Sequence, residues 1–169
     1  MLARDKEHNM NNYILIEIND KNELRTDVGM TIKSLNLIGL VEINVKIDTG
    51  CPYTSIPFKK LGKSLNLAQK MKQQDCQDPL IKKRISFGVN DTEAEKQKAK
   101  QDLSNGNYNA VKQIIFQHNG FEIDFGGIVV KQKTVMISYD RTGNILIGMD
   151  ILSKMDVHIA KSKILNIFL

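Results

Sequence analysis

The chain has 169 residues, of which 41% are hydrophobic and 25% charged, a balance that excludes global disorder and allows one buried core. The net charge is +5, but the lysines are spread along the chain and aromatic residues make up only 6%, so we expect no nucleic-acid surface. We find no signal peptide, no apolar run of membrane-spanning length and no disulfide framework in two cysteines. A cytoplasmic protein with reduced thiols, not bound to a membrane, is therefore expected.

The first half of the chain is predicted to contain mostly strands. Residues 13–18 form an apolar run, and residues 30–37 and 40–47 are predicted as two strands around Gly39. Ser55-Ile56-Pro57 is expected to open a short helix, because Pro is tolerated in a first turn. Apolar residues at helical spacing predict that this helix continues, although a glycine interrupts it: Leu61, Leu65, Ala68 and Met71, with Gly62 among them.

The second half begins with a change of character. Residues 85–89 are predicted as a strand, and residues 91–109 form a polar insertion that suits a solvated helix or a loop. Asn119-Gly120 between apolar runs predicts a hairpin, and Gly126-Gly127 ends its second strand. Further strands are expected at residues 128–130, 134–137, 157–159 and 164–169. No repeat or linker divides the chain, which predicts a single domain over residues 1–169, with a mainly β core from about residue 13.

Asp48-Thr49-Gly50 is the most informative motif. Alternating apolar residues lead directly into Asp48, as in a strand that delivers a carboxylate to a loop. A plain turn is the alternative, since Asp and Thr bond their own backbone and Gly allows positive φ. A second apolar run, Ile145-Leu146-Ile147, ends at Gly148 near the C-terminus. The tripeptide occurs once. The similar Asp27-Val28-Gly29 is not a second copy, since it has no hydroxyl residue and no apolar strand leading into it.

These two elements together resemble the retropepsin-like aspartic peptidases over about residues 40–169. The resemblance implies a closed β-barrel, a homodimer with one catalytic aspartate per subunit, a protein or peptide substrate, a mobile flap and no cofactor or metal. Asp48 matches the catalytic aspartate, Thr49 the hydroxyl that bonds across the dimer, and Gly50 the residue that lets substrate approach. A retropepsin-like module that dimerises or binds partners without catalysis is the alternative function.

The same resemblance predicts the substrate-binding residues. Cys51 stands where viral members carry Ala, while Pro52 and Met149 stand where viral members carry a paired Asp and Arg. Losing both charges together is consistent with a non-viral branch, as is Asp150 after the second glycine. The predicted substrate-binding set is Cys51, Pro52, Phe87, Gly88, Ile147, Gly148 and Met149. Residues 85–90 are predicted as the first strand of the flap, which residues 91–109 would lengthen.

Other chemistries are poorly supported by the sequence. The three histidines have no metal-ligand spacing, and a nucleophilic-serine elbow is missing. A nucleophilic Cys51 would require a histidine base nearby in space. The run 164–169 is expected as a strand of the dimer interface, with a simple edge strand as the alternative.

Overall fold

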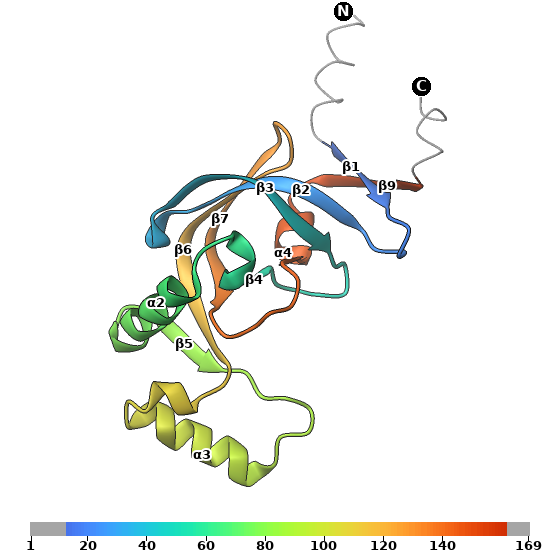
Figure 1. The fold of residues 1–169 in the computed structure, drawn as a ribbon. Coiled ribbons are helices and arrows are strands. Elements are labelled where there is room, and N and C mark those ends of the chain that lie inside the picture. Colours follow the sequence, from blue (N-terminus) through green and yellow to red (C-terminus); the bar gives the residue numbers. More distant parts are fainter. Residues whose placement is uncertain (1–12, 162–169) are drawn as a thin grey trace, which may run out of the picture. The chain divides into compact units, whose positions relative to one another are not determined.

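The structure is a computed structural model that describes residues 13–161 and consists mainly of β-strands (Figure 1). The strands are β1 Tyr13–Ile18, β2 Arg25–Ile32, β3 Leu37–Ile47, β4 Ser55–Pro57, β5 Lys82–Ile85, β6 Ile114–Asp124, β7 Val129–Ser138, β8 Leu146–Ile147 and β9 Asp156–Lys161. The α-helices are α2 Leu65–Gln77, α3 Glu93–Ser104 and α4 Met149–Leu152. Three short 3-10 helices are η1 Lys33–Leu35, η2 Phe58–Leu61 and η3 Tyr108–Ala110.

Seven strands form one sheet in the order β2-β3-β8-β4-β7-β6-β5. A further pairing of β2 with β6, between residues Gly29–Ile32 and Phe121–Asp124, closes six of the strands into a barrel and leaves β5 at the edge. Strands β1 and β9 pair separately, in parallel. The predicted fold class, a mainly β protein with a closed barrel and few helices, is confirmed.

The described chain divides into two compact units. Unit 1 holds the residues up to Ser55, residues 119–135 and the chain from Ile145 onward, while unit 2 holds residues 56–118 and 136–144. Strands β6 and β7 each contribute residues to both. Each unit has a buried apolar core of its own: unit 1 contains Met30, Ile32, Val45, Ile47, Phe121 and Ile147, and unit 2 contains Phe58, Leu61, Ile114, Phe116 and Ile137. The single-domain assignment stays a prediction.

A polar cluster lies within the core of unit 2. Asp75 on α2 accepts a hydrogen bond from the Tyr139 hydroxyl, and its Oδ2 also lies 2.7 Å from Nε2 of His118. All three side chains are buried, and Tyr139 packs against the rings of Phe58 and Phe116. Burial, with the hydrogen bond to Asp75 as the second cause, raises the pKa of Tyr139 far above its ordinary value. The phenol is therefore a permanent donor in this core.

Two N-terminal predictions are wrong in detail. The first strand of the β2–β3 pair begins at Arg25, and the chain reverses at η1 and Asn36, whose φ is 54°. Gly39 lies within β3 with φ 63°, at a shift of register against β2, so it forms a bulge and not the turn. Apolar alternation marks both strands but does not locate the reversal between them, because the bulge interrupts the alternation.

The predicted helix at Ser55 is also wrong. Ser55–Pro57 forms β4, and only then does η2 begin. Gly62, with φ 71°, ends η2. Helix α2 starts separately after Ser64, whose hydroxyl accepts a hydrogen bond from the Leu67 backbone N–H at 3.2 Å. The helical spacing from Leu61 onward thus belongs to two helices separated by a glycine.

The hairpin predicted at Asn119-Gly120 is absent. Both residues lie inside β6, where Gly120 has φ 74° and a Cβ atom would meet Lys33 at 2.7 Å. The close approach of the segment that contains Lys33 explains this glycine. The chain reverses later, at Gly126-Gly127, before β7. β7 is one strand where two were predicted. β5 ends at Ile85, so the strand predicted over residues 85–89, which was also to begin the flap, shares only that residue with it and is wrong. The polar insertion holds α3, a helix without buried residues, as its composition indicated, and residues 164–169 lie outside the described chain.

Candidate active site

Asp48 follows directly on β3, within unit 1. Strand β3 runs parallel to β8, with Ile47 opposite Ile147, and the Asp48 backbone N–H donates to the Ile147 carbonyl at 3.0 Å. Val45 and Ile47 are buried, Asp48 is half-buried, and Thr49 is exposed. Two apolar strands from opposite ends of the sequence thus fix the backbone on which the carboxylate stands.

The loop also orients the carboxylate from within. The Gly50 backbone N–H donates to Asp48 Oδ1 at 3.0 Å, and the Cys51 N–H donates to the Asp48 carbonyl at 3.2 Å. A Cβ atom at Gly50 would lie 3.3 Å from Asp48 Oδ1, which is tighter than an ordinary contact. The glycine therefore lets its N–H approach the carboxylate oxygen without a side chain crowding that oxygen.

The segment around Gly148, at the end of β8, packs closely against the Asp48 loop. The Met149 N–H donates to the Cys51 carbonyl at 2.8 Å, and the Asp150 N–H donates to the Pro52 carbonyl at 3.1 Å. A Cβ atom at Gly148 would lie only 2.7 Å from both the Cys51 carbonyl oxygen and the Tyr53 carbonyl carbon. The fold therefore brings Ile147, Gly148 and Met149 next to Asp48, Thr49, Gly50, Cys51 and Pro52, with no room for a side chain at Gly148.

A polar group that the sequence did not reveal supports the junction. The Asp150 carboxylate accepts from the Thr54 backbone N–H at 2.9 Å and from the Thr54 hydroxyl at 2.7 Å, and its other oxygen accepts from Gln132 Nε2 at 2.7 Å. The Gly148 N–H in turn donates to the Thr54 hydroxyl oxygen at 3.1 Å. Thr54 is 1% exposed. The sequence indicates Asp150 only as the residue two positions after Gly148, where the second apolar run ends. Thr54 and Gln132 carry no local signal, because Asp150, the partner of both, lies 96 and 18 positions away.

Apolar side chains surround the loop on the surface of unit 1. Tyr53 is 55% exposed and Met149 41%, while the Cys51 thiol donates to the Tyr53 carbonyl at 3.0 Å. Pro52 is exposed as well. Neither Pro52 nor Met149 carries a charge. Tyr53 is a residue of this surface that sequence reasoning missed, although its place beside the motif could have indicated it.

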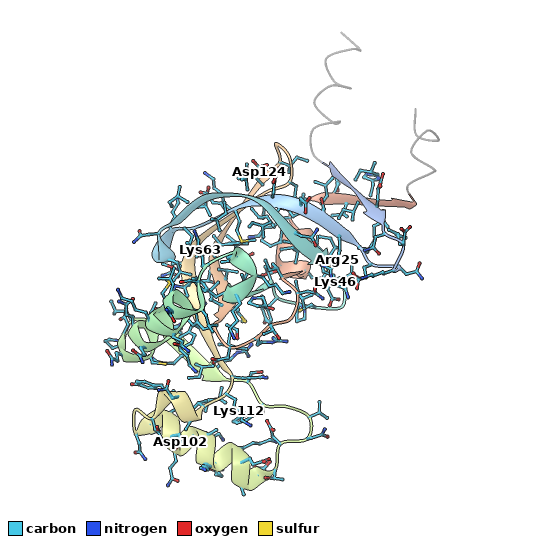
Figure 2. All side chains as sticks on the ribbon, in the orientation of Figure 1. Arg25, Lys46, Lys63, Asp102, Lys112 and Asp124 are labelled. Atoms are coloured by element: carbon cyan, nitrogen blue, oxygen red, sulfur yellow. The ribbon has the colours of Figure 1, made fainter. Side chains whose placement is uncertain are left out.

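Charged residues precede the loop on the neighbouring strands. Arg25 and Lys46 are opposite each other on β2 and β3 (Figure 2). Arg25 forms an ion pair with Glu23, and this hydrogen bond lowers the pKa of the Glu23 carboxyl. The Arg25 guanidinium also donates to the Asn44 side chain at 3.0 Å. The Arg25 side chain is thus held by Glu23 and Asn44.

Phe87 and Gly88, the predicted flap residues, belong to unit 2. They follow β5, where the Gly88 N–H donates to the Asp91 carboxylate and the Lys96 ammonium lies 5.9 Å from the centre of the Phe87 ring. Within residues 13–161, no three His, Cys, Asp or Glu side chains are grouped so that they could hold a metal ion. None of the helices in that range combines the length and apolar character needed to cross a membrane.

Comparisons with known proteins identify similar solved structures only. No protein-family model matches the sequence, and no curated protein matches it. A retropepsin-like aspartic protease from Rickettsia conorii is 15% identical, with a TM-score of 0.42, over 82% of this chain and 76% of that one. The EIAV protease in complex with the inhibitor HBY-793 is 15% identical, with a TM-score of 0.38, over 80% and 89% of the two chains. The retroviral protease-like domain of Ddi1 from Leishmania major is 14% identical, with a TM-score of 0.39, over 76% and 74%. All three are of the kind that the sequence resembles.

Proposed function

We propose that this chain is an aspartic endopeptidase that works as a homodimer and hydrolyses peptide bonds between two Asp48 carboxylates. The observation that carries the proposal is the placement of Asp48. It stands at the end of a buried strand, its carboxylate is held by the Gly50 N–H at 3.0 Å, and Gly148 packs on the loop without space for a side chain. A plain turn would require neither the parallel β8 strand nor so tight a junction.

The chemistry follows from bringing two such carboxylates together. Two carboxylates a few Å apart do not both ionise readily, so the pair shares one proton. The ionised carboxylate takes a proton from a water molecule, whose oxygen attacks the scissile carbonyl carbon. The protonated carboxylate donates to the carbonyl oxygen, which stabilises the tetrahedral intermediate. The titration belongs to the pair and not to either residue.

Assembly of two chains is part of the proposal because each chain supplies one Asp48. Thr49 and Gly50 are exposed on unit 1, so a second copy can reach the loop. In the proposed dimer the Thr49 hydroxyl bonds to the partner's loop and holds both aspartates in place. The proposed site takes no cofactor, and its ligand is a protein or peptide in an extended conformation.

Substrate contacts are proposed around the same loop. Cys51, Pro52 and Met149 would form its rim, with Ile147 and Gly148 behind them, and Phe87 and Gly88 would act from the flap. The half-buried or exposed Cys51, Pro52 and Met149 side chains are apolar or weakly polar, which suits uncharged substrate side chains next to the scissile bond.

The test is peptide cleavage by the full chain at mildly acidic to neutral pH, with a pepstatin-type inhibitor as a control. Asp48→Asn should abolish cleavage without unfolding the protein, because the amide cannot carry the shared proton. Asp27→Asn is the matched control: Asp27 also precedes a residue and a glycine, but it lies exposed on β2, and this variant should retain full activity. Cleavage by Asp48→Asn would refute the proposal. A dimeric wild type without any cleavage would favour the alternative, a catalytically silent interaction module.

A further inference from the structure

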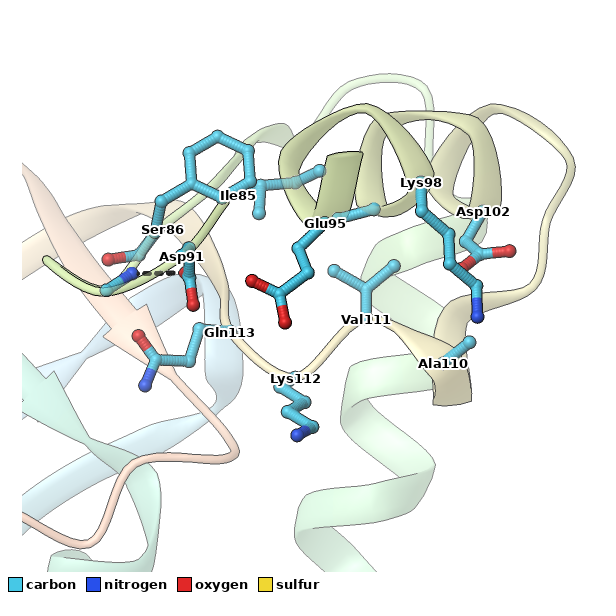
Figure 3. A pocket seen from close by; sticks show the side chains of 13 residues that line it. Ile85, Ser86, Asp91, Glu95, Lys98, Asp102, Ala110, Val111, Lys112 and Gln113 are labelled. Atoms are coloured by element: carbon cyan, nitrogen blue, oxygen red, sulfur yellow. Dashed lines mark hydrogen bonds between the residues drawn. The ribbon is translucent and has the colours of Figure 1, made fainter. Parts of the chain in front are cut away.

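Unit 2 contains a hollow of about 360 Å³ between α3 and the two chain segments that flank it (Figure 3). One wall is a stripe of α3 formed by Glu95, Lys98, Ala99 and Asp102, whose spacing places them on one helix face. The other walls come from residues 85–88 at the end of β5 and from residues 110–113 before β6. The hollow thus belongs entirely to unit 2 and to the polar insertion.

The hollow persists because α3 is held at its start and not by core packing. Its N-terminus is a capping box, in which the Thr92 N–H donates to Glu95 Oε2 at 2.7 Å and the Glu95 N–H donates to the Thr92 hydroxyl at 3.2 Å. Lys96 lies over the Phe87 ring, and the Asp91 carboxylate accepts from the Gly88 N–H. No residue of α3 is buried. The helix is therefore well defined, yet its inner stripe borders the hollow and is not packed into a core.

The lining combines an apolar floor with an excess of carboxylates. Ile85, Phe87 and Val111 supply apolar surface. Three carboxylates line the hollow against two ammonium groups: Asp91, Glu95 and Asp102 against Lys98 and Lys112. In Figure 3 the Glu95 side chain reaches from α3 into the space between Gln113 and Val111, whereas the Lys112 side chain extends away from α3. Lys98, by contrast, extends from α3 beside Val111, so the lining carries a net excess of one carboxylate.

A side chain with an apolar stem and a cationic head matches this lining. Arginine and lysine bury their methylene stems against apolar surface while the charged end pairs with carboxylates. A volume of about 360 Å³ lies at the small end of ligand pockets, so it accommodates one such side chain with some backbone. β5 is the last strand in the sheet order, and its outer edge can align an extended chain beside the hollow. Lys82 and Arg84 on β5 are exposed, which disfavours further basic residues nearby.

We infer that this hollow binds a single arginine or lysine side chain of an extended peptide whose neighbouring residues are uncharged or acidic. Binding at the hollow stands on the contacts of unit 2 alone. That the peptide is part of a substrate, held at a second point apart from the scissile bond, rests on the proposed function.

The test uses the full chain with Asp48→Asn, so that probes are bound and not cut. The probes are three capped hexapeptides of alanine and valine that differ only at the third residue, which is arginine, norleucine or glutamate. The arginine peptide should shift the backbone amide NMR signals of residues 85–88, α3 and residues 110–113, and should bind about tenfold more tightly than the glutamate peptide at low salt. Equal binding of all three peptides, or no shift in these segments, would overturn the inference.

Glu95→Gln tests the carboxylate itself. Glutamine preserves the capping box, because its side-chain oxygen accepts the Thr92 N–H, but it removes the charge. This variant should weaken the arginine peptide about fivefold and leave the norleucine peptide unchanged. Glu93→Gln is the matched control, since Glu93 lies on the same turn, is 82% exposed and pairs with Lys96 outside the hollow; equal weakening by both variants would overturn the assignment. Selective binding of the arginine peptide without any cleavage by the wild type would refute the proposed function and leave this inference standing. Cleavage without selective binding would refute this inference and leave the proposed function standing.

Discussion

A single methyl group added at Gly148 should both destabilise the protein and displace the Asp48 loop. The Cβ atom of Gly148→Ala would lie 2.7 Å from the Cys51 carbonyl oxygen and the Tyr53 carbonyl carbon, whereas ordinary contacts begin at 3.4 Å. The backbone must therefore move by about 0.7 Å, the difference between these two distances. Both atoms belong to backbone, and the Cys51 carbonyl already accepts the Met149 N–H at 2.8 Å, so relief by a rotamer change is excluded. We expect a loss of about 3 kcal/mol in the free energy of unfolding, the upper end for overpacking.

The assay is urea unfolding followed by far-ultraviolet circular dichroism. Gly143→Ala is the control, because a Cβ atom there meets nothing within 4 Å, and its free energy of unfolding should stay within about 0.5 kcal/mol of the wild type. If the proposed function holds, peptide cleavage by Gly148→Ala should fall about 100-fold, as for a catalytic group misplaced by about 1 Å. A Gly148→Ala protein as stable as Gly143→Ala would refute the geometry of the junction.

Four further outcomes are expected. Thr54→Val should lower the free energy of unfolding in urea by about 2–3 kcal/mol, because it removes one donor to the Asp150 carboxylate and the acceptor of the buried Gly148 N–H. Leaving such a buried group unpaired costs about 1–3 kcal/mol, so a loss below about 0.5 kcal/mol would contradict this role. An unfolded tyrosine ionises near pH 10, whereas the raised pKa of Tyr139 keeps it protonated in the folded state. Its contribution to the free energy of unfolding is therefore complete below about pH 10, and above that pH it declines by at most about 1.4 kcal/mol per pH unit. Tyr139→Phe should therefore flatten the alkaline decline measured by urea unfolding, and an unchanged slope would argue against a buried phenol. Specific activity should fall on dilution and recover with second-order kinetics on mixing, whereas activity independent of concentration would exclude an obligate dimer. Limited trypsin digestion should cut α3 before α2 or α4, because α3 alone of these helices has no buried residue and it carries the exposed Lys98 and Lys100; first cuts within α2 or β6 would be inconsistent with this.

Local signals explain what the sequence could predict. The apolar run at residues 13–18 gives β1 with correct bounds, and the alternation before Asp48 places it at the end of a strand. The second apolar run, which ends at Gly148, forms β8. Each of these features depends on neighbours within a few residues, which periodicity can detect.

Long-range contacts explain what the sequence could not predict. Gly120 is typical of a hairpin turn, but here it allows a close approach to Lys33, next to the pairing of β2 with β6. The Thr54–Asp150–Gln132 group and the Asp75–His118–Tyr139 cluster join residues far apart in the sequence, and each member alone is an ordinary polar residue. The break between η2 and α2 was missed because both helices share one apolar spacing.

The junction between the Asp48 loop and β8 also governs when the site can form during synthesis. Thr54 and Asp150 are 96 positions apart, so this contact can form only after Asp150 has left the ribosome. The parallel pairing of β1 with β9 requires residues that emerge later still, up to Lys161. Such non-local pairing folds slowly, and a partial chain exposes the apolar β3 strand without its partner. A nascent chain therefore holds Asp48 in an unassembled loop until Asp150 and the β9 residues have emerged, which separates synthesis of the Asp48 loop from the appearance of any activity.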